Sequence, residues 1–277
     1  MKTNTALSPK HARCFTYTHV HTHSDNELAV FYHHPRYHKG SIYCLAWLGD
    51  SLLASGSNDQ TIKLLSYSSS SSPCILQGQL SVHNGTVRDL VFLPDGHLLS
   101  GGAGDSSLKL SDVHTGRLIH SLVGHTDQIL SVAIVSDTVI ASGGQDKTVR
   151  LWDKRHTRCF HTIKTSHPIA SLSAFNNHLA SSQVDGTCSV HDLKILKTVG
   201  TFHPHSDECR TVRYSPSGQW LLTASYDKTV CVADAVSLEW REVGRHEDKV
   251  IQCRWHSGGR LLVSTGADKK ACFWKLN

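Results

Sequence analysis

Apolar and polar residues alternate in short runs along this chain from about residue 38 onward. The run from Ile129 to Ile134 has period two, which is typical of a strand buried on one face. Polar turns rich in Asp, Gly and Ser separate the runs. The pattern therefore predicts an all-β chain built from many short strands.

One order of elements repeats six times. A His in a loop precedes an alternating strand, a second strand ends in small residues, a turn carries an Asp, and a third strand follows. The loop histidines are His38, His83, His125, His167, His205 and His246. The turn aspartates are Asp59, Asp105, Asp146, Asp185, Asp227 and Asp268. Both markers recur at intervals of about forty residues, which is the length of a four-stranded propeller blade.

The most complete unit runs from Gly124 to Asp153. We expect His125 to hydrogen-bond Asp146, with Ser142 and the indole N–H of Trp152 completing a buried polar network. Because the third strand ends in Trp-Asp only here, we expect the full network once and incomplete copies elsewhere. The His, Asp and Ser imitate a catalytic triad by composition, but their repetition favours a structural role.

These units resemble the WD repeat, and the resemblance implies a β-propeller. Six blades are recognisable, with a partial N-terminal one. We expect residues 28–277 to form the propeller and residues 1–27 to form a poorly patterned, His-rich tail. Two closures remain open. Leu28 to Tyr32 could supply the outer strand of a closed six-bladed ring. Alternatively, Arg13 to Tyr17 and Leu28 to Tyr32 could be the remaining half of the first blade in a truncated seven-bladed ring.

Several stretches carry a narrower resemblance. They are His38 to Trp47, Ala141 to Asp153, His203 to Ser206 and Asp248 to His256. Together they are similar to the C-terminal propeller of the nemitin family, which are neuronal, microtubule-associated WD-repeat proteins. That resemblance implies a cytoskeletal adaptor for microtubule-associated proteins. The helical dimerisation region of the family is not in this sequence, so functions that need it are not implied.

Charge and cysteine content narrow the function only slightly. A net charge of +5 permits acidic partners. No stretch interleaves basic and aromatic residues as single-strand nucleic-acid binders do, so we do not expect nucleic acid. The nine cysteines form no CxxC pair and there is no secretory signal, so we expect reduced thiols in a cytosolic protein. No apolar run is long enough to span a membrane.

Motifs of catalysis and of metal binding are weak. The sequence contains no Walker loop, GxSxG elbow or HExxH spacing, so we expect no enzyme activity and no cofactor. His19, His21 and His23 alternate and would share one face of an extended chain. A solvated tail explains them better than a metal site, because no fourth ligand is evident.

Binding is expected on the face where the His loops and Asp turns meet. That face should present a basic rim for protein partners, such as microtubule-associated proteins or microtubules. Its members are Lys39, Arg88, Lys147, Arg210, Lys228, Arg245, Lys249, Lys269 and Lys270. The alternative is a substrate receptor of a cullin-type ubiquitin ligase, because Trp152 to Arg155 matches the short WDxR box of such receptors. The sequence thus predicts a cytoplasmic, cytoskeleton-associated interaction scaffold.

Overall fold

The computed structural model describes residues 15–16, 37–66 and 75–276, and within them it contains strands and turns but no helix. The strands form six four-stranded antiparallel sheets. The prediction of an all-β propeller is therefore confirmed, with six blades.

Each of the first five sheets runs from the centre of the ring outward in chain order, and the sixth does so for its three inner strands. The innermost strands are β2 (Ile42–Leu48), β6 (Val87–Phe92), β10 (Ile129–Ile134), β14 (Ile169–Phe175), β18 (Cys209–Tyr214) and β22 (Val250–Trp255). The second strands are β3 (Leu52–Ser57), β7 (Leu98–Gly102), β11 (Val139–Gly144), β15 (His178–Gln183), β19 (Trp220–Ser225) and β23 (Leu261–Gly266).

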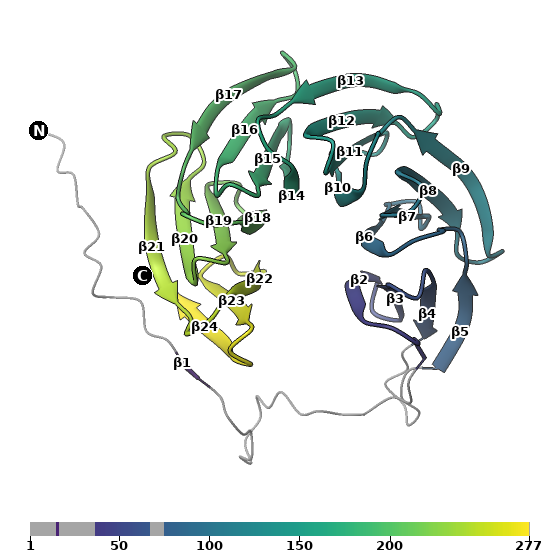
Figure 1. The fold of residues 1–277 in the computed structure, drawn as a ribbon, viewed down its shortest axis with the longest axis horizontal. Helices are drawn as coiled ribbons and strands as arrows, with labels where there is room; N and C mark the ends of the chain where they lie inside the picture. Colours follow the sequence, from purple (N-terminus) through teal and green to yellow (C-terminus); the bar gives the residue numbers. More distant parts are fainter. Residues whose placement is uncertain (1–14, 17–36, 67–74, 277) are drawn as a thin grey trace, which may run out of the picture.

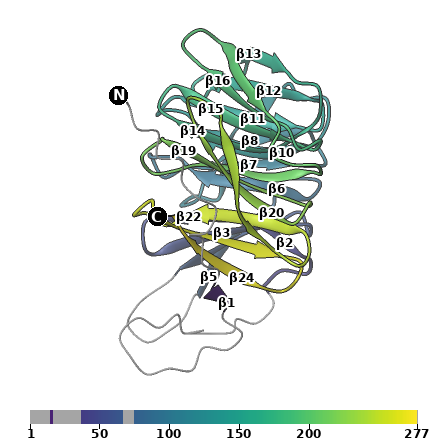
Figure 2. The ribbon, with the colours of Figure 1, turned by 90° about the vertical axis from the view of Figure 1, so that its left-hand side faces the viewer.

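The outer half of each sheet completes the blade. The third strands are β4 (Ile62–Ser66), β8 (Ser107–Asp112), β12 (Thr148–Asp153), β16 (Cys188–Asp192), β20 (Thr229–Asp234) and β24 (Ala271–Lys275). The outer strands are β5 (Ile75–Leu80), β9 (Arg117–Val123), β13 (Cys159–Lys164), β17 (Lys197–Phe202), β21 (Trp240–Arg245) and β1 (Phe15–Thr16). Figure 1 shows the outer strands along the circumference, and Figure 2 shows the strands running between the two faces of a flat ring.

Two irregularities recur among the blades. A register shift follows the first residue of every inner strand, as between Ile129 and Ser131. A second shift occurs where the third and outer strands pair in the first five blades, as between Leu151 and Trp152. Bulges of this kind increase the twist of a sheet, which is needed for sheets that pack face to face around an axis.

Small residues on the second strands allow consecutive blades to approach closely. A Cβ atom on Gly101 would lie 2.7 Å from Cγ2 of Ile129 in the next blade, and one on Gly143 would lie 2.4 Å from Cγ2 of Ile169. The small residues that the sequence places at the ends of second strands are therefore explained by this contact. Five hydrophobic clusters fill the five junctions between consecutive blades.

The sixth sheet takes its outer strand from the N-terminal part of the chain. β1 pairs antiparallel with β24, with Phe15 opposite Phe273. This short strand lies within the segment expected to be a poorly patterned tail, and within the Arg13 to Tyr17 strand expected there. Leu28 to Tyr32, the other candidate for closure, lies outside the described residues, as do His19, His21 and His23.

The first and sixth blades do not pack against each other as their neighbours do. Among the described residues, no hydrophobic cluster joins β2 to the sheet of β22, β23 and β24. Figure 1 shows no strand in the arc of the ring between them. Within the described residues, the first and sixth sheets are therefore the one pair of successive sheets in the ring that is not joined by a hydrophobic cluster.

Candidate functional site

The four residues predicted to form a network in the third blade are joined by hydrogen bonds. Nδ1 of His125 lies 2.9 Å from a carboxylate oxygen of Asp146. Nε2 of His125 lies 2.7 Å from the hydroxyl of Ser142, and Nε1 of Trp152 lies 2.8 Å from the same hydroxyl. The chain places them there because the His loop, the Asp turn and two strands meet at one end of the blade.

The donors and acceptors fix the tautomer of His125. Because an ionised carboxylate only accepts, Nδ1 carries the proton and donates it to Asp146. Nε2 is then the acceptor, so the Ser142 hydroxyl donates to it and accepts from the Trp152 indole N–H. Burial lowers the pKa of His125, which keeps the ring neutral as this pattern requires. His125, Ser142 and Trp152 are all buried, so the trio presents no nucleophile to a substrate.

A second complete network stands in the sixth blade, so the expectation of a single intact copy is wrong. His246 lies 2.9 Å from Asp268 and 2.7 Å from Ser264, and Trp274 lies 2.8 Å from the same Ser264 hydroxyl. The Trp is at the same position as Trp152, but Lys275 follows it in place of Asp. The Trp-Asp dipeptide was therefore too strict a marker, since only the indole takes part in the network.

The other blades keep parts of the arrangement. In the first blade His38 reaches both Asp59 and Ser55. In the fifth, His205 reaches Asp227 and Thr223, and the threonine takes the place of serine.

Two blades depart further. In the second blade His83 bonds Ser100, but its Nδ1 stands 3.5 Å from Asp105 and has no hydrogen bond. In the fourth, His167 is exposed and His191 occupies the Trp position, where it bonds Ser181.

All six turn aspartates have pKa values below the ordinary value. Burial of each carboxyl raises its pKa, but hydrogen bonds and nearby positive charge outweigh that effect; for Asp146 the largest of these contributions comes from Thr148, and for Asp105 it comes from Lys109. The six are Asp59, Asp105, Asp146, Asp185, Asp227 and Asp268. The folded state therefore prefers the charged form of all six groups.

Acid should consequently destabilise the ring through these turns. Above about pH 3.9, the pKa of an unfolded Asp, the carboxylates are charged in both states and their full contribution is present. As the pH falls through the lower folded values, that contribution is lost. Urea unfolding between neutral pH and about pH 3 should show a falling free energy of unfolding, with a smaller fall in Asp146→Asn. Asp127→Asn, a change in the His loop of the same blade but outside the network, should follow the wild type, and an unaltered slope in Asp146→Asn would contradict the assignment.

The predicted basic rim divides into three groups. Arg210, Arg245 and Lys270 form ion pairs with Glu208, Glu242 and Glu247 respectively. Arg88 lies over the ring of Tyr43, with 4.8 Å between its guanidinium carbon and the ring centroid, and Lys249 lies 4.5 Å from the centroid of Tyr226. The remaining four are exposed lysines whose side chains form no ion pair within the described residues: Lys39, Lys147, Lys228 and Lys269.

Three of these four lysines occupy the same position in their blades. Lys147, Lys228 and Lys269 each follow the turn Asp by one residue and have positive φ angles of 60°, 76° and 65°. The left-handed conformation is uncommon for a residue other than Gly, and here the turn geometry imposes it. The Asp turn and the His loop lie on one face because Asp146 also accepts from the backbone N–H of Thr126. The three lysines therefore project from the same face of the ring.

An aromatic side chain missed at the sequence level joins this face. Tyr226 precedes its turn Asp, and both Arg210 and Lys249 lie over its ring, at 5.6 Å and 4.5 Å from the centroid. The three residues come from β18, the turn after β19 and the loop before β22. No local stretch of sequence interleaves them, so only the fold brings them together.

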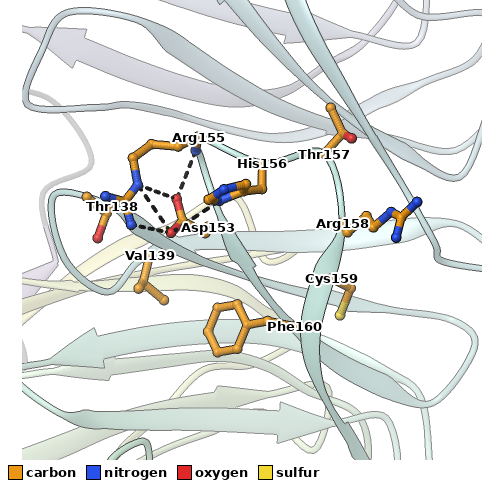
Figure 3. A pocket seen from close by; sticks show the side chains of 9 residues that line it. All are labelled: Thr138, Val139, Asp153, Arg155, His156, Thr157, Arg158, Cys159 and Phe160. Carbon is orange, nitrogen blue, oxygen red and sulfur yellow. Dashed lines mark hydrogen bonds and ion pairs between the residues drawn. The ribbon is translucent and has the colours of Figure 1, made fainter.

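The opposite end of the third blade carries the WDxR residues. Arg155 donates through Nε and one terminal nitrogen to the carboxylate of Asp153, at 2.9 Å and 2.5 Å. Both residues line a shallow hollow together with Val139, His156 and Phe160, and Figure 3 shows the guanidinium and the imidazole turned toward Asp153. Arg155 is 63% exposed and its charge is already partnered. The hollow thus combines a charged pair with an apolar lining that includes the exposed side chain of Phe160.

The described part of the chain contains no cluster of metal-ligating side chains and no membrane-spanning helix. No group of three or more His, Cys, Asp or Glu side chains in it could hold a metal ion. No helix in it is long and apolar enough to cross a membrane.

Comparison with known proteins identifies the repeat. The model of the family described as "WD domain, G-beta repeat" matches residues 25–66, 74–112, 116–153, 196–234 and 240–275, which together make up more than half of the chain. The chain belongs to the WD40 repeat family. WD40 domains bind protein partners, and their propeller is typically a non-catalytic scaffold.

The WD40 family model passes over residues 154–195, which contain three strands of the fourth blade. The structure nevertheless forms a complete sheet there from β14, β15, β16 and β17. This is also the blade in which His167 is exposed and His191 replaces Trp. The blade has lost the Trp of the network and the burial of its loop His, but it has kept the pairing of His167 with Asp185 and its strand pattern.

The WD40 relatives of this chain are distant. It is 24% identical over 253 residues to Protein tipD of Dictyostelium discoideum, covering 86% of this chain and 40% of the relative. It is 28% identical over 239 residues to Autophagy-related protein 16 of Arabidopsis thaliana, covering 81% of this chain and 45% of the relative. It is 26% identical over 238 residues to Nuclear distribution protein PAC1 of Arthroderma otae, covering 83% of this chain and 48% of the relative. The chain spans about half the length of these relatives or less.

Proposed function

We propose that this chain is a non-catalytic, cytoplasmic interaction scaffold that serves as an adaptor for microtubule-associated proteins and associates with the cytoskeleton. The observation that carries the proposal is the repeated exposed lysine of the Asp turn, at Lys147, Lys228 and Lys269, on the face where the His loops also open. Positive charge spread over a rim steers and orients an acidic partner more than it tightens binding.

This face combines basic side chains with an aromatic ring, which distinguishes it from a surface that only contacts solvent. Lys249 and Arg210 flank Tyr226, which adds a flat contact surface beside the charges. Aromatic and Arg side chains are enriched at the centres of protein interfaces. An acidic peptide of a microtubule-associated protein, or the acidic surface of a microtubule, has the complementary chemistry.

The comparisons support the role of the chain as an interaction scaffold more strongly than they support the choice of partner. The names of two distant relatives refer to autophagy and to nuclear distribution, and a shared fold does not by itself assign a shared function. The likeness to the nemitin family remains a prediction from the stretches that carry it. It supplies the choice of microtubule-associated partners.

Co-sedimentation of the purified chain with microtubules tests direct binding. We expect pelleting at low salt that decreases as salt is added, because exposed charges are screened within about 10 Å at 0.1 M salt. The triple variant Lys147→Glu, Lys228→Glu and Lys269→Glu should abolish the pelleting.

The matched control changes three basic residues on the opposite face by the same charge. Arg158, Lys194 and Lys197 are exposed and lie at the other end of the blades: Arg158 and Lys194 lie between third and outer strands, and Lys197 is the first residue of β17. Their replacement by Glu should leave pelleting unchanged. If both triple variants lose pelleting equally, net charge rather than the lysine face explains it. If the wild type does not pellet at low salt, direct binding is excluded and only an adaptor acting through a bound partner remains.

The hollow beside Arg155 favours one alternative function. A ubiquitin-ligase substrate receptor would dock its ligase adaptor against the WDxR residues at this end of the third blade. Its test is a pull-down of a ligase adaptor that is lost in Arg155→Ala. The ion pair with Asp153 already neutralises this Arg, so we place the alternative second.

A further inference from the structure

Two cysteine side chains meet at the junction of the fourth and fifth blades. Sγ of Cys188, the first residue of β16, lies 3.5 Å from Sγ of Cys209, the first residue of β18. Both side chains are buried in the hydrophobic cluster that joins these two blades. The fold therefore brings two free thiols from different sheets into contact.

The other filled junctions place two aliphatic residues at the same register. One member lies three positions after the turn Asp, and the other is the first residue of the next inner strand. The four aliphatic pairs, each within one hydrophobic cluster, are Ile62 with Val87, Leu108 with Ile129, Val149 with Ile169 and Val230 with Val250. A buried cysteine can replace an aliphatic residue as a small hydrophobe. Packing alone, however, does not explain why both members of one pair are cysteines.

The surroundings of the pair favour the nucleophilic form of one thiol. Burial raises the pKa of Cys209, but the contact with Cys188 and the neighbouring imidazole of His205 outweigh that effect and lower the pKa below its ordinary value. Burial and the contact with Cys209 raise the pKa of Cys188 well above its ordinary value. Cys188 therefore keeps its proton and donates it to the Cys209 sulfur, and the reactive thiolate lies on Cys209.

The pair lies close to the face that carries the His loops and Asp turns. Thr187 precedes Cys188 and Glu208 precedes Cys209, and both preceding residues are partly exposed. Local opening of strand ends costs much less than global unfolding. Hydrogen peroxide is small and uncharged, so a local opening at these two strand ends is enough for it to reach the sulfurs.

We propose that Cys188 and Cys209 form a peroxide-sensitive dithiol that closes to a disulfide and fastens the fourth blade to the fifth. The Cys209 thiolate attacks one oxygen of hydrogen peroxide and the O–O bond breaks, which leaves a sulfenic acid on Cys209. The released hydroxide takes up the proton that Cys209 had lost and becomes water. The Cys188 sulfur then attacks Sγ of Cys209, the S–O bond breaks, and the OH group leaves with the Cys188 proton as a second water.

The electron balance of this reaction is complete. The two thiols together lose two electrons, and the peroxide gains them. The sulfurs must approach from 3.5 Å to about 2.05 Å, the length of a disulfide bond. Disulfides of cytosolic proteins are usually transient and redox-sensing, so the bond is reversible in that setting. The inference is independent of the basic face and of its partner.

The disulfide reinforces a blade whose polar network is incomplete. In the fourth blade His167 is exposed, and His191 bonds Ser181 at the position where the third and sixth blades have Trp. A covalent link from β16 to β18 restricts the unfolded chain and so stabilises the folded one. The link therefore strengthens this junction only under oxidising conditions.

Peptide mapping of the oxidised full chain tests the link. Trypsin releases Cys188 in the peptide 165–194 and Cys209 in the peptide 198–210, and each peptide contains one cysteine. The native chain is treated with hydrogen peroxide, and the remaining thiols are then blocked in denaturant. We expect the two peptides as one species that dithiothreitol separates, and a melting temperature that rises on oxidation and returns on reduction.

Several results would overturn the proposal. One is recovery of Cys188 and Cys209 as blocked free thiols, and another is recovery of Cys209 as an unlinked sulfinic acid. A link from the peptide 165–194 to the peptide 229–241, which contains Cys231, would assign the wrong partner. Oxidation of Cys253, an equally buried thiol, to the same extent as Cys209 would show that the contact confers no reactivity. An unchanged melting temperature in the linked chain would refute the fastening of the blades.

Matched variants come from the repeat itself. Cys188→Val introduces the residue that β12 has at the equivalent position, Val149, so the variant should fold. It should lose both the linked species and the shift in melting temperature. Cys231→Ser introduces the residue that β16 has at the equivalent position, Ser189, and should keep both effects. A rise in melting temperature on oxidation of Cys188→Val equal to that of the wild type would refute the proposal.

Discussion

Replacing Trp152 with alanine is expected to lower the free energy of unfolding by about 3–5 kcal/mol, the range for truncating a buried aromatic residue. Trp152 is 0% exposed and packs at the junction of the second and third blades. The change would leave a cavity and would also remove the donor to the Ser142 hydroxyl. Urea or thermal unfolding monitored by circular dichroism measures the effect.

Trp240→Ala supplies the control for this prediction, because Trp240 is 45% exposed at the start of β21. Removing the Trp240 side chain should lower the free energy of unfolding much less than removing that of Trp152. Trp152→Phe separates packing from the hydrogen bond, since it keeps an aromatic ring and removes the N–H. Equal effects of Trp152→Ala and Trp240→Ala would contradict a central role for the third-blade network.

Asp146→Ala is expected to cost about 1–3 kcal/mol, because the buried Nδ1–H of His125 would lose its acceptor. Asp105→Ala should cost less, although it changes the same turn of the second blade. There Nδ1 of His83 is already without a hydrogen bond, so the change strands no new buried donor. Asp105 does pair with Lys109, but the ammonium group of Lys109 keeps its hydrogen bond to Ser121 when that carboxylate is removed. Equal losses in the two variants, measured by chemical unfolding, would refute the hydrogen-bond assignment.

The blade pattern was predictable because the residues that mark each blade lie close together in the sequence. His, Asp and the alternating strands recur at a fixed period, and this period follows from the length of four strands and their turns. The network of the third blade follows from the same pattern. The second network was not predicted because Trp274 is followed by Lys275 and so does not match the Trp-Asp dipeptide. The hydrogen bond needs only the indole of the Trp.

Features that depend on which residues become neighbours in the folded structure could not be predicted from the sequence. Nothing local in the chain indicates that Tyr226 lies between Arg210 and Lys249, because the three belong to different strands and loops. The apolar residues Ile42 and Leu45 have the same pattern as their buried equivalents in β6. Whether such a face is covered depends on what stands opposite, which a repeat pattern does not state.

The pairing of β1 with β24 has a kinetic consequence. Each of the first five sheets is built from neighbouring segments, so it can form as soon as its own stretch has left the ribosome. The sixth sheet joins Phe15 to Phe273, so its last strand must wait until almost the whole chain has been synthesised. Contacts between residues this far apart in sequence form slowly, because a long loop must close first. We expect the edge of β24 to be the last part of the ring to become protected from hydrogen exchange during refolding.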